Sequence, residues 1–122
     1  PLDSLKVTDE ASAAVAVAPR VSLDSMKEKI AFTHFLNAGE VSRAASGMTP
    51  EQSNPSLDVL TICLLVMQNG FTVIGKAAPA SPENFNRELG QQFAFEDAIR
   101  QLWPLEGYAL RERLHQERQA GL

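Results

Sequence analysis

The chain reads LDVLTICLLVMQNGFTVIGK over residues 57–76, where two apolar runs rich in β-branched residues flank Asn69 and Gly70. An Asn-Gly pair between two such runs is a strong local signal for a β-hairpin, because both residues tolerate the positive φ of a type I′ turn. The sequence therefore predicts an antiparallel hairpin with a two-residue turn. In that register Leu65 pairs with Ile74.

Both faces of this predicted hairpin are apolar, whereas a hairpin with one solvated face alternates apolar and polar residues. One face carries Leu60, Ile62, Leu64, Val66, Phe71 and Val73. The other carries Val59, Cys63, Leu65, Met67 and Ile74, which we interpret as a self-association face. Two strands are marginal in water without helices packed on them. We expect helices on one face and, on the second, the first helix, the N-terminal segment or another subunit, of which we favour another subunit.

A first helix is predicted over residues 22–37, where Ser22 or Asp24 provides the N-cap and apolar residues recur at helical spacing. Gly39 follows as a plausible stop. Residues 42–56 are rich in Ser, Gly and Pro, so they are interpreted as a loop.

Two more helices are predicted after the hairpin. The first begins at Ser81-Pro82 and has a bend or a restart at Gly90. Pro104 requires a break, so a further helix is expected from about Pro104 to Gln116.

Residues 1–21 show neither a helical nor a strand period, which predicts an extended N-terminal arm before a single domain at residues 22–122. The expected fold class is α+β, with one antiparallel β-hairpin packed by about three helices. An arm rich in Ala and Val is suited to lie along a neighbouring subunit and add backbone hydrogen bonds to an open sheet edge.

The composition narrows the classes of function. The 122 residues fit one domain and carry a net charge of -4, which disfavours binding to nucleic acid. The Ala-rich stretch at residues 11–18 is too short to span a membrane, so no membrane partner is expected. The single cysteine, Cys63, excludes an intrachain disulfide and suits a reducing compartment.

The sequence contains no group of residues that predicts catalytic chemistry. His34 and His115 lie near opposite ends of the chain and Cys63 lies in an apolar strand, so no metal site, nucleophile pair or cofactor is predicted. The adjacent Glu96 and Asp97 point about 100° apart on a helix and are expected to face solvent. We expect no catalytic residues, no cofactor and no enzymatic activity.

An aromatic and basic string begins at Trp103, just before Pro104. It contains Trp103, Tyr108, Arg111 and Arg113, which we consider as a contact surface for a partner. The alternative is a helix whose first turn packs on the hairpin and whose charged residues face water, and we favour this alternative.

Three segments of this chain occur together in a known family. They are NGFTVIGK at 69–76, SPENF at 81–85 and WPLEGYALRERL at 103–114. In order and spacing they resemble a family of small tailed-phage proteins named for gene product forty-nine of a coliphage and gene product sixty-six of a Shigella phage. The resemblance covers residues 61–114. It implies a phage origin and carries over neither a reaction nor a catalytic residue.

These observations favour a non-catalytic phage protein that acts through protein–protein contacts. Its expected partners are further copies of itself and a major capsid protein, with the N-terminal arm holding it in the virion as a minor or decorating component. The alternative is an early effector that binds and inhibits a host protein or a defence signal. Either protein would be made in the host cytoplasm during infection, and the first would then be assembled into the virion.

Overall fold

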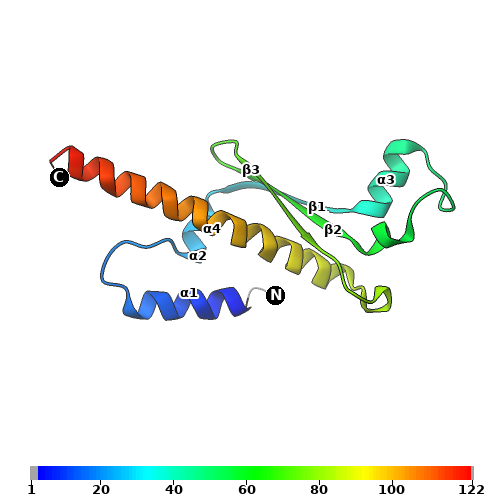
Figure 1. Ribbon diagram of the computed structural model, residues 1–122, viewed down its shortest axis with the longest axis horizontal. Coiled ribbons are helices and arrows are strands. Elements are labelled where there is room, and N and C mark those ends of the chain that lie inside the picture. Colours follow the sequence, from blue (N-terminus) through cyan, green and yellow to red (C-terminus); the bar gives the residue numbers. More distant parts are fainter. Residues whose placement is uncertain (1–2, 122) are drawn as a thin grey trace.

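The computed structural model describes residues 3–121 and shows a three-stranded antiparallel sheet packed against a long helix (Figure 1). The strand order is β1-β2-β3. The elements are α1 (Asp3–Val15), α2 (Leu23–Glu28), β1 (Ile30–Asn37), α3 (Ala38–Ser46), the 3₁₀ turn η1 (Pro55–Val59), β2 (Thr61–Met67), β3 (Thr72–Ala77), the 3₁₀ turn η2 (Pro82–Asn84) and α4 (Arg87–Gln119). The predicted α+β class is confirmed, but a third strand joins the hairpin.

The hairpin turn lies where it was predicted, with one more residue in its loop. The N–H of Met67 donates to the C=O of Phe71 over 2.8 Å, which leaves three residues in the loop. Gly70 has a φ of 88°, and within residues 3–121 no residue other than glycine has a positive φ. Only one position therefore adopts the left-handed conformation, as in a three-residue hairpin loop, and the predicted two-residue type I′ turn is wrong.

The extra loop residue shifts the predicted strand register by one. Leu65 pairs with Val73, and Leu64 pairs with Ile74. Because side chains alternate between the two faces of a strand, the shift moves Ile74 to the face opposite Leu65. The predicted division of residues between the two faces of the hairpin is therefore incorrect.

Strand β1 replaces most of the helix predicted over residues 22–37. The helical part, α2, is capped by Ser22 through a capping box with Ser25 and stops at Glu28. The following residues IAFTHFLN pair with β2, so that Phe35 lies opposite Cys63. This stretch contains aromatic and β-branched residues, which pack well on a pleated sheet, and pairing with β2 outweighs its helical periodicity.

A helix, α3, follows β1 directly and includes the first residues of the loop predicted over 42–56. Helix α3 is capped by Asn37, and Gly39 lies inside it instead of ending a helix. A Cβ on Gly39 would lie 1.9 Å from Asp58 Oδ1, so this glycine lets α3 approach η1 closely. Arg43 forms an ion pair of 2.6 Å with Asp58 across the same contact. The predicted loop is thus confined to the residues after Ser46.

Helix α4 is one continuous element where two helices were predicted. It begins after the N-cap Asn86, because Ser81 and Pro82 form only the short turn η2. Pro104 lies inside it. A proline within a helix removes one hydrogen bond and costs about 3 kcal/mol. Burial of Leu102 in the core, two residues before this point, offsets that cost and holds the helix to the sheet.

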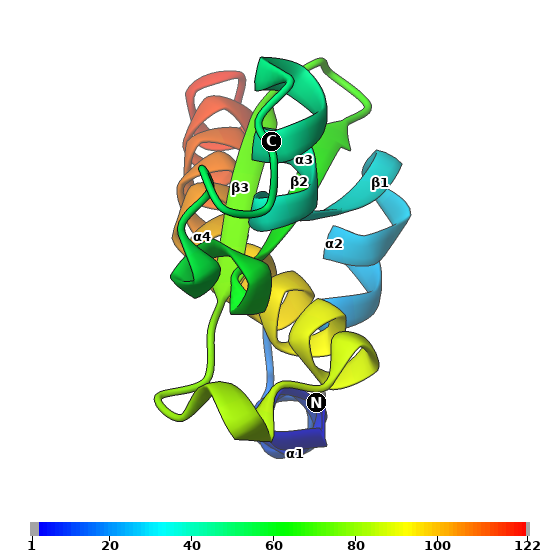
Figure 2. The same cartoon turned by 90° about the vertical axis from the view of Figure 1, so that its right-hand side faces the viewer.

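Helix α4 crosses the sheet at a glycine. A Cβ on Gly75 of β3 would lie 2.0 Å from the backbone oxygen of Ala94, so only a glycine allows the two backbones to come this close. Ala94 and Ala98 of α4 are fully buried at the crossing. The core lies between β2, β3, α2 and α4, and Figures 1 and 2 show how these elements are arranged. Its buried residues are Leu5, Leu23, Met26, Cys63, Leu65, Met67, Val73, Ala94, Ala98, Ile99 and Leu102.

The N-terminal segment is not extended. Residues Asp3–Val15 form α1, whose buried residue Leu5 joins the core cluster. Asp9 accepts hydrogen bonds from Arg20 at 2.8 Å and from the N–H of Leu23 at 3.1 Å. Alanine has the highest helix propensity, and these three contacts fix the helix to the body of the protein. The prediction of an extended arm is wrong for these residues.

Candidate interaction surface

The residues of the predicted self-association face do not lie together. Cys63, Leu65 and Met67 are buried in the core beneath α4. Ile74 lies on the other side of the sheet, and Val59 belongs to η1. The core takes the first three residues because the actual register places them on the same face as Gly75, where α4 packs.

The opposite side of the sheet is apolar and carries no helix of the described chain. We call it the outer face, and it consists of Phe32, His34, Leu36, Ile62, Leu64, Val66, Thr72, Ile74 and Lys76. Phe32 is 57% exposed and Ile74 is 60% exposed, while the central-strand residues are half-buried by their neighbours. Single exposed apolar side chains are ordinary, but a contiguous apolar patch marks an interaction site.

The chemistry of the outer face suits another apolar surface. The rings of Phe32 and His34 stack with their centroids 6.1 Å apart. Lys76 is its one side chain of permanent charge, at the β3 edge. A partner that covers this face therefore desolvates few charges, which keeps the cost of association low.

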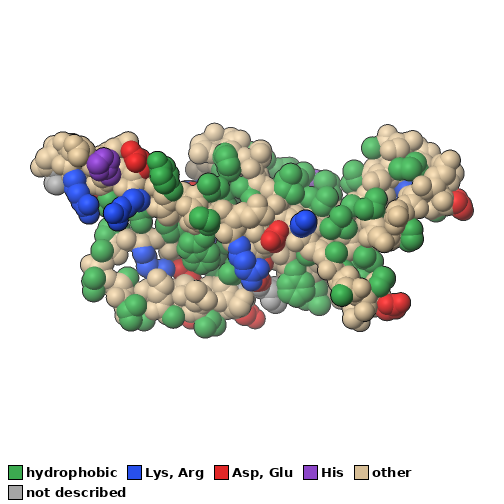
Figure 3. All heavy atoms as spheres, viewed as in Figure 1, with side chains coloured by type: hydrophobic (Ala, Val, Ile, Leu, Met, Phe, Trp, Pro, Cys, Tyr) green, Lys and Arg blue, Asp and Glu red, His purple; other side chains and the backbone are tan. Residues whose placement is uncertain are grey.

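The second predicted contact surface is spread around α4. Trp103 is half-buried and packs against the core, whereas Tyr108 is 72% exposed. Five residues along an α-helix turn through about 140°, so the two aromatic rings point in different directions. Arg111 and Arg113 are exposed near the C-terminal end of α4, where Figure 3 shows basic side chains beside a histidine. The structure does not bring these four residues together into one surface.

The residues with potential for catalysis are also apart. Burial raises the pKa of the Cys63 thiol from its ordinary value of 9.0 to about 11, which keeps it protonated at neutral pH. His34 lies on the outer face and His115 is exposed near the end of α4. Within residues 3–121, no three His, Cys, Asp or Glu side chains come close enough to hold a metal ion.

Glu96 and Asp97 were predicted to face solvent, but both make contacts with other parts of the protein. Glu96 is only 5% exposed and accepts hydrogen bonds from Arg100 and from the hydroxyl of Ser4. Asp97 accepts a hydrogen bond of 2.9 Å from the backbone N–H of Lys76. The pair Glu96–Arg100 has the i,i+4 spacing of a helical ion pair and was open to prediction, whereas the contacts with Ser4 and Lys76 join residues that are distant along the chain.

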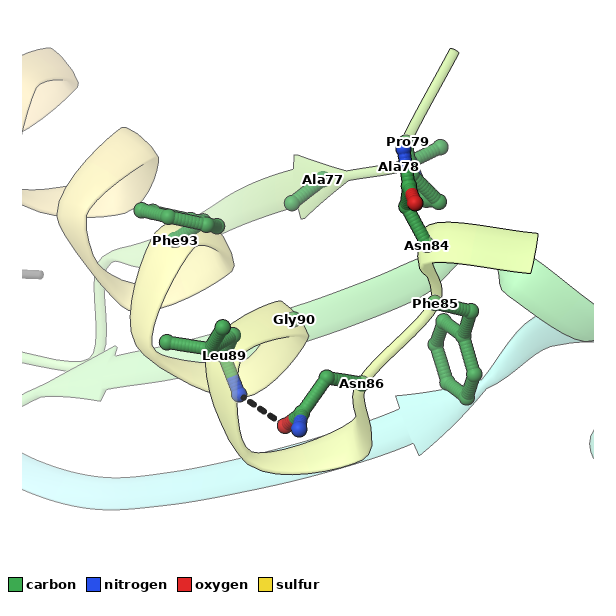
Figure 4. Close-up of a pocket in the computed structure, with 9 residues that line it drawn as sticks. All are labelled: Ala77, Ala78, Pro79, Asn84, Phe85, Asn86, Leu89, Gly90 and Phe93. Atoms are coloured by element: carbon green, nitrogen blue, oxygen red, sulfur yellow. Dashed lines mark hydrogen bonds between the residues drawn. The ribbon is translucent and has the colours of Figure 1, made fainter. Parts of the chain in front are cut away.

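A small pocket opens where β3 leads into α4 (Figure 4). It encloses about 190 Å³ and is lined by Ala77, Ala78, Pro79, Asn84, Phe85, Asn86, Leu89, Gly90 and Phe93. The amide of Asn86 is already engaged, since its Oδ1 accepts a hydrogen bond from the N–H of Leu89. The pocket is mainly apolar and has the size of a few side-chain groups.

No helix within residues 3–121 is both long enough and apolar enough to cross a membrane. The structure thus defines a small α+β protein whose sheet has one face packed against a helix and one apolar face left open. The chain belongs to the phage protein (N4 Gp49/phage Sf6 gene 66) family, whose model matches residues 21–114. The match begins after α1 and includes the whole sheet. No curated protein and no solved structure matches the chain.

Proposed function

We propose that this phage protein is non-catalytic and acts by binding another protein through its outer face. The observation that carries this proposal is the apolar sheet surface opposite α4, with Phe32 and Ile74 more than half exposed. Membership in a phage family supports a role during phage infection or assembly. A protein surface with an apolar patch of its own is the partner that such a face fits best.

The positions of the reactive side chains also support a binding role. A nucleophile needs a base within hydrogen-bonding reach, about 3 Å. Cys63 is enclosed in the core, while His34 and His115 lie on the outer face and near the end of α4. This arrangement offers no acid, base and nucleophile at one place among the described residues.

The specific role we propose is that of a minor or decorating component of the virion. The outer face binds a major capsid protein, and the N-terminal segment provides a second attachment. Helix α1 supports this second part because it exposes Val7 and Val15 while burying Leu5. It is therefore attached to the body of the protein through few side chains and presents apolar surface of its own.

The test is mass spectrometry of purified phage particles, with the copy number of this protein counted against the major capsid protein. Many copies per particle are expected. Phe32→Glu and Ile74→Glu should lower that copy number, because each places a charge on the outer face. Tyr108→Glu is the matched control, since it introduces the same charge at an exposed aromatic residue of α4.

Two outcomes contradict this proposal. Absence of the protein from particles would exclude the virion role and favour the alternative, an early effector that binds and inhibits a host protein or a defence signal. An unchanged copy number in both outer-face variants, with loss only in Tyr108→Glu, would place the attachment on α4 instead of the sheet.

A further inference from the structure

The two edges of the sheet differ in whether their backbone groups are satisfied. At the β3 edge, the N–H of Lys76 donates to Asp97 over 2.9 Å, and the C=O of Ile74 accepts from Gln101 over 2.7 Å. Both acceptor and donor side chains come from α4. Side chains of α4 therefore occupy the β3 edge at these two groups, which hinders a further strand from pairing there.

The β1 edge is open. The N–H of Ala38 donates to the C=O of Leu60, which fixes the alternation: even-numbered residues of β1 point their backbone groups at β2. The N–H and C=O groups of Thr33 and Phe35 therefore point away from the sheet. No backbone or side-chain hydrogen bond among residues 3–121 reaches them.

Strand β1 also lacks the features that protect sheet edges. Natural edge strands carry lysine, proline or inward-pointing charges that prevent pairing with other chains. The sequence IAFTHFLN contains no proline, lysine, arginine or carboxylate. Its one irregularity lies at its beginning, between Ile30 and Phe32, and leaves the rest of the strand regular. Figure 2 shows β1 at the side of the sheet away from β3.

We propose that β1 pairs antiparallel with β1 of a second copy, so that two sheets join into one across a twofold axis. The register that pairs the free groups of these two residues with each other places Thr33 opposite Phe35 of the other copy. In this register the C=O and N–H groups of both residues find partners in each copy. His34 then lies opposite its own counterpart at the axis, and Phe32 lies opposite Leu36.

A second copy suits this edge because the pairing keeps both faces consistent. Residues directly opposite each other in an antiparallel pair lie on the same face. In the proposed register, Phe32, His34 and Leu36 of one copy meet the same three residues of the other on the outer face. The two outer faces thus become one continuous apolar surface, and no charged side chains of β1 oppose each other. This inference goes beyond the proposed function and holds whichever partner the outer face binds.

The first experiment measures the mass of the full chain in solution by light scattering after size exclusion. The wild-type protein should be a dimer at micromolar concentration. Thr33→Pro should convert it to a monomer, because proline removes an N–H that points outward while leaving the hydrogen bonds to β2 intact. Thr72→Pro is the matched control, since its N–H also points away from β2, at the other edge, and it should remain dimeric.

A second experiment tests the register and does not depend on how proline is tolerated. Opposite residues in an antiparallel pair have Cβ atoms about 5 Å apart, close to disulfide geometry. Under oxidising conditions His34→Cys should form a covalent dimer, whereas Lys76→Cys at the β3 edge should not. A monomeric wild type would overturn the proposal. So would a dimer that Thr33→Pro leaves intact and that His34→Cys does not cross-link.

Discussion

The contact between Gly75 and α4 predicts that a single methyl group will destabilise this fold. In Gly75→Ala the new Cβ would lie 2.0 Å from the backbone oxygen of Ala94 and 2.7 Å from the backbone nitrogen of Ala98. Neither atom belongs to a flexible side chain, so α4 must retreat by more than an ångström to restore ordinary contact at about 3.4 Å. Overpacking of this kind costs about 1–3 kcal/mol, and a collision with rigid backbone belongs at the upper end, about 3 kcal/mol.

Urea denaturation followed by circular dichroism measures this loss. With a denaturant slope of about 1–3 kcal/mol per molar urea, the midpoint should fall by about 1–3 M. Gly107→Ala is the matched control, because it adds the same methyl group inside α4 with no atom within 4 Å. It should stabilise the protein by up to about 1 kcal/mol through helix propensity. Equal midpoints for Gly75→Ala and the wild type would refute the close crossing of β3 and α4.

Three further predictions follow from individual contacts. The first concerns Cys63, whose thiol has a pKa of about 11 in the folded state against 9.0 ordinarily. The free energy of unfolding should therefore fall as the pH rises above 9.0. In alkaline denaturation curves, Cys63→Ala should lack this part of the decline. Asn37→Ala should lower the free energy of unfolding, measured by urea denaturation, by about 2 kcal/mol, because Asn37 caps α3 and donates to the C=O of Asp58 from a buried position. Asn54→Ala is the control: it removes an exposed cap and should cost less than about 1 kcal/mol. Asp9→Ala should speed proteolysis between α1 and α2 without unfolding the sheet, since Asp9 binds both Arg20 and the N–H of Leu23; unchanged cleavage would contradict this role.

The hairpin was predictable because its signal is local. Asn69 and Gly70 stand between two β-rich runs, and Gly70 adopts the left-handed conformation that the turn needs. The loop length was not predictable, because Gln68 is as compatible with the loop as with the strand. An uncovered apolar face was expected, but of the residues assigned to it only Ile74 lies on the open side, while Cys63, Leu65 and Met67 lie beneath α4.

Strand β1 and helix α4 were missed for a different reason, which is that distant contacts decide them. Residues 23–30 contain apolar positions at helical spacing, and only pairing with β2, more than 20 residues later, makes Ile30–Asn37 a strand. In α4, Pro104 is a local signal for a break, yet the helix continues because Leu102 before it is buried against the sheet. In both cases packing outweighs a local preference, which a pattern along the chain does not contain.

The reason the outer face stays open lies in the alternation along β2. From Thr61 to Met67 both faces of this strand carry apolar residues, so no choice of register gives the sheet a polar side. Helix α4 can cover only one face of the sheet. It packs on the face with Gly75, where the backbones of the helix and the strand can approach closely. Ile74, the neighbour of Gly75 in β3, must then point to the other side. The small residue that fixes the helix thus also determines which apolar side chains remain available for a partner.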